Sequence, residues 1–528
     1  MRRLKDFVAR CEGINIGLGL WICTFLAIVF IRDCIEGLVV SNFFPEFNEF
    51  HLLHFPVFFV SALLALIILL HFFTKTDIIK VSKICLIFFA VIILPAALDF
   101  LLSLSVGREV DYEYITEDIW KALVNFFNPF VTLPAIPFTI RIEIAAITFC
   151  SFLYIFIKRN KILWSLLGAF LAFIICFFYI AVPGILVGSC VVFLKVLSSI
   201  LRFAHLPLGG AGLGGIVDEK VVVIQELIFT AILGAIWFWR YDLKKAKALF
   251  ANLRLNRSFH YMLLVLMGFV LYLSEVRGVL DLFILLKMAG ILLAVFFAFQ
   301  FSVVVNDIFD IDCDKASNSQ RPLVTGTLGK SEYLKVGYVY LALALLFAFW
   351  VSGTCFMITL VYIAFYFVYS APPLRLKRFF PVSSLVIGIQ ALLAFLLGQM
   401  SLQGESEGFF AYSNVWIMIF TVFLLSSNIK DLKDIEGDRN CNIRTLPVIF
   451  GETKARMTIG FLVFLSYLLV PIFLYPLFYS PLVTYSALLF GLANYFYIKK
   501  PGTQEKPVFF MYFSYALLIV LFLRKTQL

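Results

Sequence analysis

The chain has 528 residues, of which 62% are hydrophobic and only 14% are Asp, Glu, Lys or Arg. Soluble domains average about 25% charged residues, so this composition excludes an ordinary soluble protein and indicates a multi-pass membrane protein. The net charge of +10 does not predict nucleic-acid binding, because the basic residues are scattered between apolar segments and are typical of cytoplasmic loops.

Residues 1–240 are predicted to form an N-terminal transmembrane domain of about six helices. Basic residues lie before the first apolar run and after the second, fourth and sixth runs, which is one side of the membrane. The acidic residues Glu109 and Asp111 lie in a loop on the opposite side. Because cytoplasmic loops are enriched in basic residues, the N-terminus is expected in the cytoplasm. No motif in this half names an activity. The apolar runs lie near 14–32, 50–73, 78–104, 130–157, 162–182 and 221–239.

Two further features of this half, and the cysteines of the whole chain, are interpreted without a catalytic role. Counting 183–203 as a span would place the basic linker outside, so this segment is predicted to be interfacial or re-entrant. The glycine-rich run 209–215 lacks the strand and the Lys-Ser/Thr pair of a phosphate-binding loop and is interpreted as a flexible loop. The ten cysteines show no metal-binding spacing and are predicted to be small apolar side chains.

A basic cytoplasmic linker, 241–258, is predicted to lead into a second domain at 259–528. The expected fold class of the whole chain is therefore all-α, with two transmembrane bundles. The loops between the spans of the second domain alternate so that all of the polar motifs described below fall on the cytoplasmic side. Its nine predicted spans are 259–276, 281–305, 334–352, 354–370, 381–402, 412–429, 457–476, 480–498 and 508–524.

A cluster of polar residues directly follows the apolar run 282–305. Asn306, Asp310 and Asp314 are spaced i, i+4 and i+8, and Asp307 lies on the shoulder of the same helix face. Carboxylates at the end of a membrane helix are costly unless they have a function. Because such closely spaced carboxylates repel one another, a divalent cation with oxygen ligands is the expected partner.

A second acidic cluster follows the apolar run 412–429. Asp431, Asp434 and Asp438 are spaced i, i+3 and i+7. Two acidic faces, each at the end of a membrane segment, are predicted to hold Mg²⁺ between them, with an anion such as a diphosphate completing the coordination.

These stretches resemble the UbiA superfamily of intramembrane prenyltransferases. The first is similar to its NDxxDxxxD signature, the stretch 430–447 resembles its second aspartate motif, and 369–378 resembles its basic loop. The resemblance covers about 250–528 and implies a nine-helix bundle that uses Mg²⁺ and a prenyl diphosphate. Where this family commonly has Gly before Ile-Arg/Lys-Thr, the chain has Cys441-Asn442.

The resemblance also implies roles for individual side chains. Asp312 and Glu436 fall on the other face from their neighbours and are expected to be solvated. The residues with implied roles are the catalytic Asp310, Asp314, Asp434 and Asp438, the additional metal ligands Asn306, Asp307 and Asp431, the diphosphate-binding Arg321, Arg375, Lys377 and Lys430, and the cavity residue Tyr369.

The leading functional prediction is transfer of an isoprenoid from its diphosphate to a hydrophobic acceptor, either aromatic or lipid, in a bacterial or archaeal plasma membrane. One alternative is phosphoribosyl transfer to a polyprenyl phosphate on the same fold. It is disfavoured because no His lies between Asp314 and Arg321, where those relatives carry a His-Pro insertion. A second alternative is a transporter whose acidic clusters bind cations.

Overall fold

The computed structural model describes residues 2–40, 49–106, 115, 119–131, 133, 136–201, 219–275, 282–402, 413–475 and 480–526. Within these ranges the chain is helical and forms no β-strand, only an isolated bridge between Phe379 and Arg444. Fourteen helices of the described residues are long and apolar enough to cross a membrane. The predicted class, an all-α multi-pass membrane protein, is confirmed. The glycine-rich run 209–215 and the acidic residues Glu109 and Asp111 lie outside the described residues.

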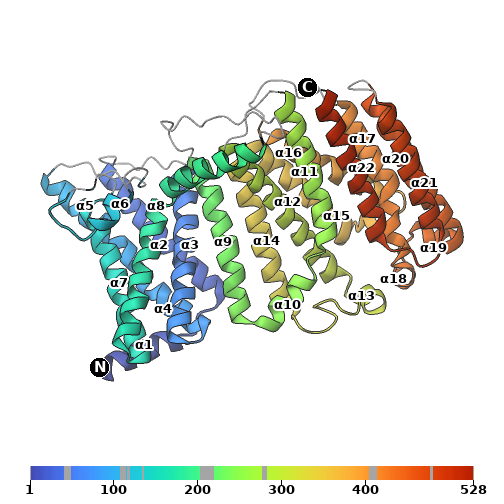
Figure 1. Cartoon of the computed structure of the whole chain (residues 1–528). Coiled ribbons are helices and arrows are strands. Elements are labelled where there is room, and N and C mark those ends of the chain that lie inside the picture. Colours follow the sequence, from blue (N-terminus) through green and yellow to red (C-terminus); the bar gives the residue numbers. More distant parts are fainter. Residues whose placement is uncertain are drawn as a thin grey trace. The chain divides into compact units, whose positions relative to one another are not determined.

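The first compact unit comprises Met1–Leu243 and Leu280–Phe283. Its core is built from aromatic and aliphatic side chains such as Phe25, Ile67 and Phe89. Helix α8 continues to Leu201, and Figure 1 shows its later part running crosswise to the upright helices, as an interfacial segment would. The main helices of this unit are α1 (Arg2–Gly13), α2 (Leu18–Val40), α3 (Glu49–Thr74), α4 (Ile78–Phe89), α5 (Ile93–Val106), α6 (Ile119–Val124), α7 (Phe138–Arg159), α8 (Ile162–Leu201) and α9 (Glu219–Tyr241).

The second compact unit comprises Lys244–Val279 and Ile284–Leu528. Each of the nine predicted spans coincides with one of its helices, but the side chains at the end of α22 fall outside the described residues, so the count of nine stays a prediction. The helices are α10 (Leu243–Ala251), α11 (Leu255–Glu275), α12 (Leu282–Phe309), α13 (Ile311–Ser317), α14 (Lys330–Val351), α15 (Gly353–Ser370), η3 (Leu376–Arg378), α16 (Val382–Met400), α17 (Ser413–Ser426), η4 (Ser427–Leu432), α18 (Ile435–Asn440), α19 (Leu446–Phe450), α20 (Glu452–Leu474), α21 (Pro481–Lys499) and α22 (Glu505–Thr526).

Two glycines bring α11 and α16 into close contact. A Cβ atom at Gly268 would lie 2.1 Å from the carbonyl oxygen of Phe395, and one at Gly398 would lie 1.9 Å from that of Val265. Small residues allow the backbones of membrane helices to approach closely, which compensates for the weak hydrophobic drive between helices in lipid. This contact fixes α11, whose first turn carries residues that line the candidate site.

Candidate active site

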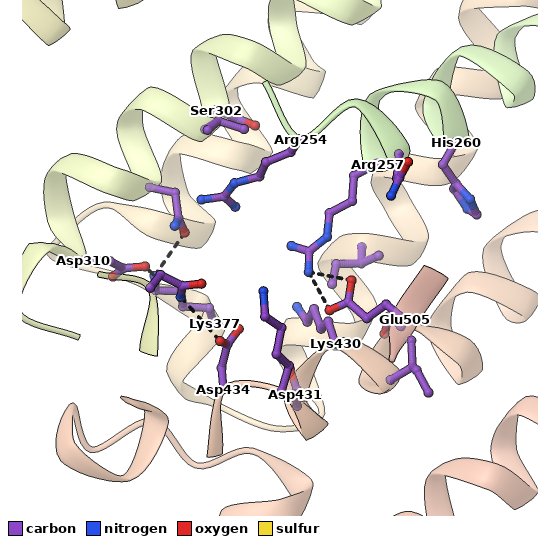
Figure 2. Close-up of a pocket in the computed structure, with 18 of the residues that line it drawn as sticks. Arg254, Arg257, His260, Ser302, Asp310, Lys377, Lys430, Asp431, Asp434 and Glu505 are labelled. Atoms are coloured by element: carbon purple, nitrogen blue, oxygen red, sulfur yellow. Dashed lines mark hydrogen bonds and ion pairs between the residues drawn. The ribbon is translucent and has the colours of Figure 1, made fainter. Parts of the chain in front are cut away.

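A cavity of about 1110 Å³ lies within the second unit, where the two acidic clusters meet. Figure 2 shows Asp310 and Lys377 on one side of it and Arg257 with Glu505 on the other. Tyr261, Phe299 and Tyr366 contribute an aromatic wall. Of the sequence-predicted site residues, those that line the cavity are Asn306, Asp310, Asp314, Arg321, Tyr369, Lys377, Lys430, Asp431, Asp434 and Asp438.

The two acidic clusters form the same local backbone structure. Asp310 follows the end of α12 with φ −111° and ψ 12° and precedes the short helix α13. Asp434 follows η4 with φ −108° and ψ 21° and precedes the short helix α18. In both clusters the amide four residues later donates a 2.8 Å hydrogen bond to the carbonyl of this aspartate, from Asp314 and Asp438 respectively. Each cluster therefore turns its carboxylates from the end of a membrane helix toward the cavity.

Asp310 is held by two cations from the basic loop. The guanidinium Nη2 of Arg375 lies 2.6 Å from Oδ1 of Asp310, and the Lys377 ammonium donates a short hydrogen bond to Oδ2. Lys377 also donates to Oδ1 of Asn306 at 3.2 Å. Burial lowers the pKa of Lys377, and the neighbouring Asp310 carboxylate opposes that shift. The basic loop and the first cluster therefore form one connected network, although Arg375 itself is not among the residues that line the cavity.

Asp307 is buried and is not among the residues that line the cavity. Its carboxylate accepts hydrogen bonds from Arg254 at 2.6 Å, Arg321 at 2.8 Å and Tyr333 at 2.9 Å. Arg321 also donates a short hydrogen bond to Asp314. Asp307 thus positions two arginines at the edge of the site, and its predicted role as a metal ligand stays a prediction.

The second cluster is paired far less. Among the described residues, no ion pair involves Asp431, Asp434 or Asp438, and the amide of Asn318 contacts Oδ1 of Asp434 at 3.5 Å. Lys430 donates a short hydrogen bond to the hydroxyl of Tyr369 instead, with its Nζ 5.0 Å from the centre of that ring. The carboxylate oxygens of this cluster remain available for a ligand in the cavity.

A disulfide joins the two acidic clusters. Cys313 of α13 and Cys441, just after α18, are bonded with their Cα atoms 5.8 Å apart across 128 residues of chain. The interpretation of all ten cysteines as apolar filler is therefore wrong for this pair, because a spacing of this length says nothing about proximity in the fold. The next residue, Asn442, has φ 55°, so a residue tolerant of the left-handed region occupies the position of the family's usual glycine.

The donor chemistry of the cavity fits a hard divalent cation. The side chains that could bind a metal ion here are the carboxylates of Asp and Glu and the amide oxygen of Asn306. Oxygen atoms of these kinds are the ligands that Mg²⁺ prefers. Burial raises the pKa of Asp314 to about 6 and that of Asp438 to about 7, so a nearby cation would relieve an electrostatic cost. Within the described residues, no three His, Cys, Asp or Glu side chains are already gathered closely enough to hold a metal ion.

Sequence reasoning missed five charged residues that line the cavity, namely Arg254, Arg257, Lys433, Glu505 and Lys506. Arg254 and Arg257 were assigned to the basic linker, and Glu505 lies in the predicted loop 499–507, yet all three line the cavity. The predicted topology could have identified them, since each lies on the same side of the membrane as the motifs. Burial lowers the pKa of Arg254, an effect that the carboxylate of Asp307 opposes.

Comparisons with known proteins find similarity over the second half of the chain. A sequence model described as the UbiA prenyltransferase family matches residues 261–517. A digeranylgeranylglyceryl phosphate synthase of Methanocaldococcus jannaschii is 27% identical over 230 residues, which cover 42% of this chain and 76% of that protein. The corresponding synthase of Sulfolobus acidocaldarius is 28% identical over 167 residues, covering 31% of this chain and 58% of its own length.

Solved structures of similar proteins cover about the same part of the chain. A UbiA homolog from Archaeoglobus fulgidus bound to GPP and Mg²⁺ is 20% identical, with a TM-score of 0.42 over 53% of this chain and 99% of that one. A digeranylgeranylglyceryl phosphate synthase structure is 23% identical, with a TM-score of 0.39 over 53% of this chain and 99% of that one. The family match begins at residue 261, so it does not extend to residues 1–260.

Proposed function

We propose that the second unit, whose residues 261–517 match the model of the UbiA prenyltransferase family, moves an isoprenoid from a prenyl diphosphate to an acceptor held in the same cavity. The observation that carries this proposal is the meeting of both aspartate clusters and the basic loop around one cavity of about 1110 Å³. A diphosphate requires both cations and metal-binding oxygens, and the cavity offers both within one space.

The basic side chains of the first cluster are suited to the leaving group. Arg321 and Lys377 line the cavity and already form hydrogen bonds with carboxylates, so their charges are fixed in place before a substrate arrives. Charge-assisted hydrogen bonds from such groups stabilise negative charge that develops on the departing diphosphate. Mg²⁺ bound by Asp310, Asp314, Asp434 and Asp438 would supply further charge neutralisation at this diphosphate.

The aromatic wall serves the other end of the substrate. Tyr261 packs with its ring centre 5.4 Å from Phe299 and 6.2 Å from Tyr366. These apolar faces would enclose the isoprenoid tail and exclude water from the allylic carbocation that forms when the diphosphate leaves. Without that exclusion, water would compete with the acceptor for the carbocation.

Of the two predicted acceptor classes, aromatic and lipid, the names of the similar proteins favour a lipid. The synthases from Methanocaldococcus jannaschii and Sulfolobus acidocaldarius are named for making digeranylgeranylglyceryl phosphate, a prenylated glycerol phosphate. We infer that the acceptor of this chain belongs to the lipid class of the two classes that the sequence leaves open. We also propose that the motif loops face the cytoplasm, on the basis of the basic loops at the same helix ends.

The test is an assay of the purified full chain with Mg²⁺ and labelled prenyl diphosphates of several lengths, offered with prenylated glycerol phosphates and with aromatic acceptors. We expect a labelled lipid product that disappears with EDTA and returns when Mg²⁺ is added back. Turnover that persists without a divalent metal would contradict the assigned role of the aspartates. Transfer of label from phosphoribosyl diphosphate, with no product from any prenyl donor, would replace this proposal with the phosphoribosyl alternative.

A further inference from the structure

The cavity contains a second polar group outside the two aspartate motifs. Arg257, in the first turn of α11, donates hydrogen bonds from Nη2 to both carboxylate oxygens of Glu505 at 2.8 and 3.0 Å. Glu505 begins α22, and both residues line the cavity. Figure 2 shows this pair on the opposite side of the cavity from Asp310 and Lys377, with Lys430 between them.

Two cations on this side of the cavity, Arg257 and Lys430 of the second motif, differ from those beside the first cluster. Lys377 and Arg321 are hydrogen-bonded to aspartates of the motif. Lys430 is instead paired with the neutral hydroxyl of Tyr369, and Arg257 with Glu505. An incoming anion can therefore bind Lys430 and Arg257 without taking either from a predicted metal ligand.

Glu505 also differs from the other acidic groups. Among the described residues that line the cavity, it supplies the one carboxylate outside the two aspartate motifs. Metal binding by the motifs would leave this carboxylate free for another task. An anion that engages Arg257 would compete with Glu505 for the guanidinium and so release the carboxylate toward the cavity.

We propose that Arg257, Lys430 and Glu505 form the acceptor subsite, which takes a hydroxyl acceptor that carries an anionic head group. Arg257 and Lys430 bind the head group, and Glu505 accepts the hydroxyl proton. Lys430, for which the resemblance implies a diphosphate contact, is thus assigned to the acceptor instead. This inference rests on the proposed prenyl transfer and deepens it. The C–O bond to the diphosphate breaks, and its electron pair leaves with the diphosphate. The acceptor oxygen forms the new C–O bond, and its proton passes to the Glu505 carboxylate and then to water.

The head-group assignment is tested by equilibrium binding to the purified full chain without any prenyl donor. The probes are a prenylated glycerol phosphate and the same prenylated glycerol without phosphate. We expect the wild-type protein to prefer the phosphate probe, and Arg257→Gln to weaken its binding at least about tenfold, the loss of one charge-assisted contact. The KM for the prenyl diphosphate should stay within about twofold. Equal binding of both probes by the wild-type protein would overturn the subsite.

Loss of the Arg257–Glu505 pair could also disturb folding, so the matched control removes both charges. Arg257→Gln with Glu505→Gln leaves no unpaired charge and should keep the wild-type melting temperature, yet still bind the phosphate probe weakly. If this double variant binds the phosphate probe as well as the wild type does, the anion is held elsewhere. Because binding is measured without turnover, this experiment tests the head-group assignment even if prenyl transfer is not observed.

The proton-acceptor assignment is tested by turnover. Glu505→Gln should lower kcat about 10²- to 10⁴-fold, the usual contribution of a general base, with little change in the KM of either substrate. Glu505→Asp should recover part of the rate. An unchanged kcat in the Gln variant would overturn the role of Glu505. A wild-type protein without any prenylated product would instead refute the proposed function.

Discussion

The two aspartate clusters have the same backbone conformation, but their carboxylates contact different side chains. Asp310 and Asp434 have nearly the same φ and ψ values, and each precedes a short helix. Around Asp310 the structure places Arg375 and Lys377, whereas Asp434 is contacted by the amide of Asn318 at 3.5 Å. Similar turns at the ends of two membrane segments thus create two electrostatically different sides of one cavity.

Because of this difference, we expect the first cluster to keep its geometry when a ligand binds and the second cluster to change. The first cluster holds its charges in place through ion pairs, so its geometry depends little on a ligand. The second cluster exposes carboxylates to the cavity, and burial raises the pKa of Asp438 to about 7, so its charge is poorly compensated without a cation. Binding of a metal diphosphate should therefore change the second side more than the first.

The largest expected effect comes from removing one aspartate on each side. Asp310→Ala and Asp434→Ala should both abolish product formation, because each is a predicted metal ligand. Only Asp310→Ala leaves two cations, Arg375 and Lys377, without their buried partner, and breaking a buried ion pair typically costs about 3–5 kcal/mol. Asp434→Ala should change stability by less than about 1 kcal/mol, since no described ion pair is lost.

Product formation and thermal unfolding in the same detergent distinguish these outcomes. The matched control is Asp310→Ala with Lys377→Met, which removes one uncompensated charge and should recover part of the stability but none of the activity. Equal destabilisation by the two single variants would mean that the two clusters are electrostatically alike, and would contradict the stronger ion pairing of the first cluster.

The disulfide gives a second and smaller effect, because it ties the two sides together. Cys313→Ser or Cys441→Ser removes a bond that closes a loop of 128 residues. Disulfides typically contribute about 2–4 kcal/mol, mainly by restricting the unfolded chain, so either variant should lower the melting temperature in non-reducing buffer. Under a reducing agent, wild-type and variant proteins should melt together. A variant that melts like the wild type in both buffers would show that the disulfide does not form in the protein.

Much of this site follows from local sequence. Hydrophobic runs predicted the helices, because a membrane helix must satisfy its own backbone and therefore shows a long apolar segment. The motif spacing predicted that the aspartates of each cluster share a helix face, and Asp310, Asp314, Asp434 and Asp438 line one cavity, while their roles stay predictions. Both expectations depend on residues close together in the chain.

What the sequence did not predict depends on contacts between distant segments. Asp307 belongs to the same motif as Asp310, yet its neighbours in space, Arg254 and Tyr333, lie 53 and 26 residues away and turn it into a support for arginines. The Arg257–Glu505 pair spans 248 residues and belongs to no recognised motif. Pairings of this kind are set by how helices pack, which local periodicity does not encode.

The smallest effect sharpens the comparison within a single motif. Asp312 is predicted to be solvated, and its side chain is 89% exposed and paired with the exposed Lys315 at 2.8 Å. Exposed ion pairs contribute little to stability, so Asp312→Asn should keep activity within about twofold of the wild type and leave the melting temperature unchanged. Asp314→Asn, two residues along but directed into the cavity, should lose activity strongly. A large loss for Asp312→Asn would mean that charge alone, not the direction of each carboxylate, makes the motif work.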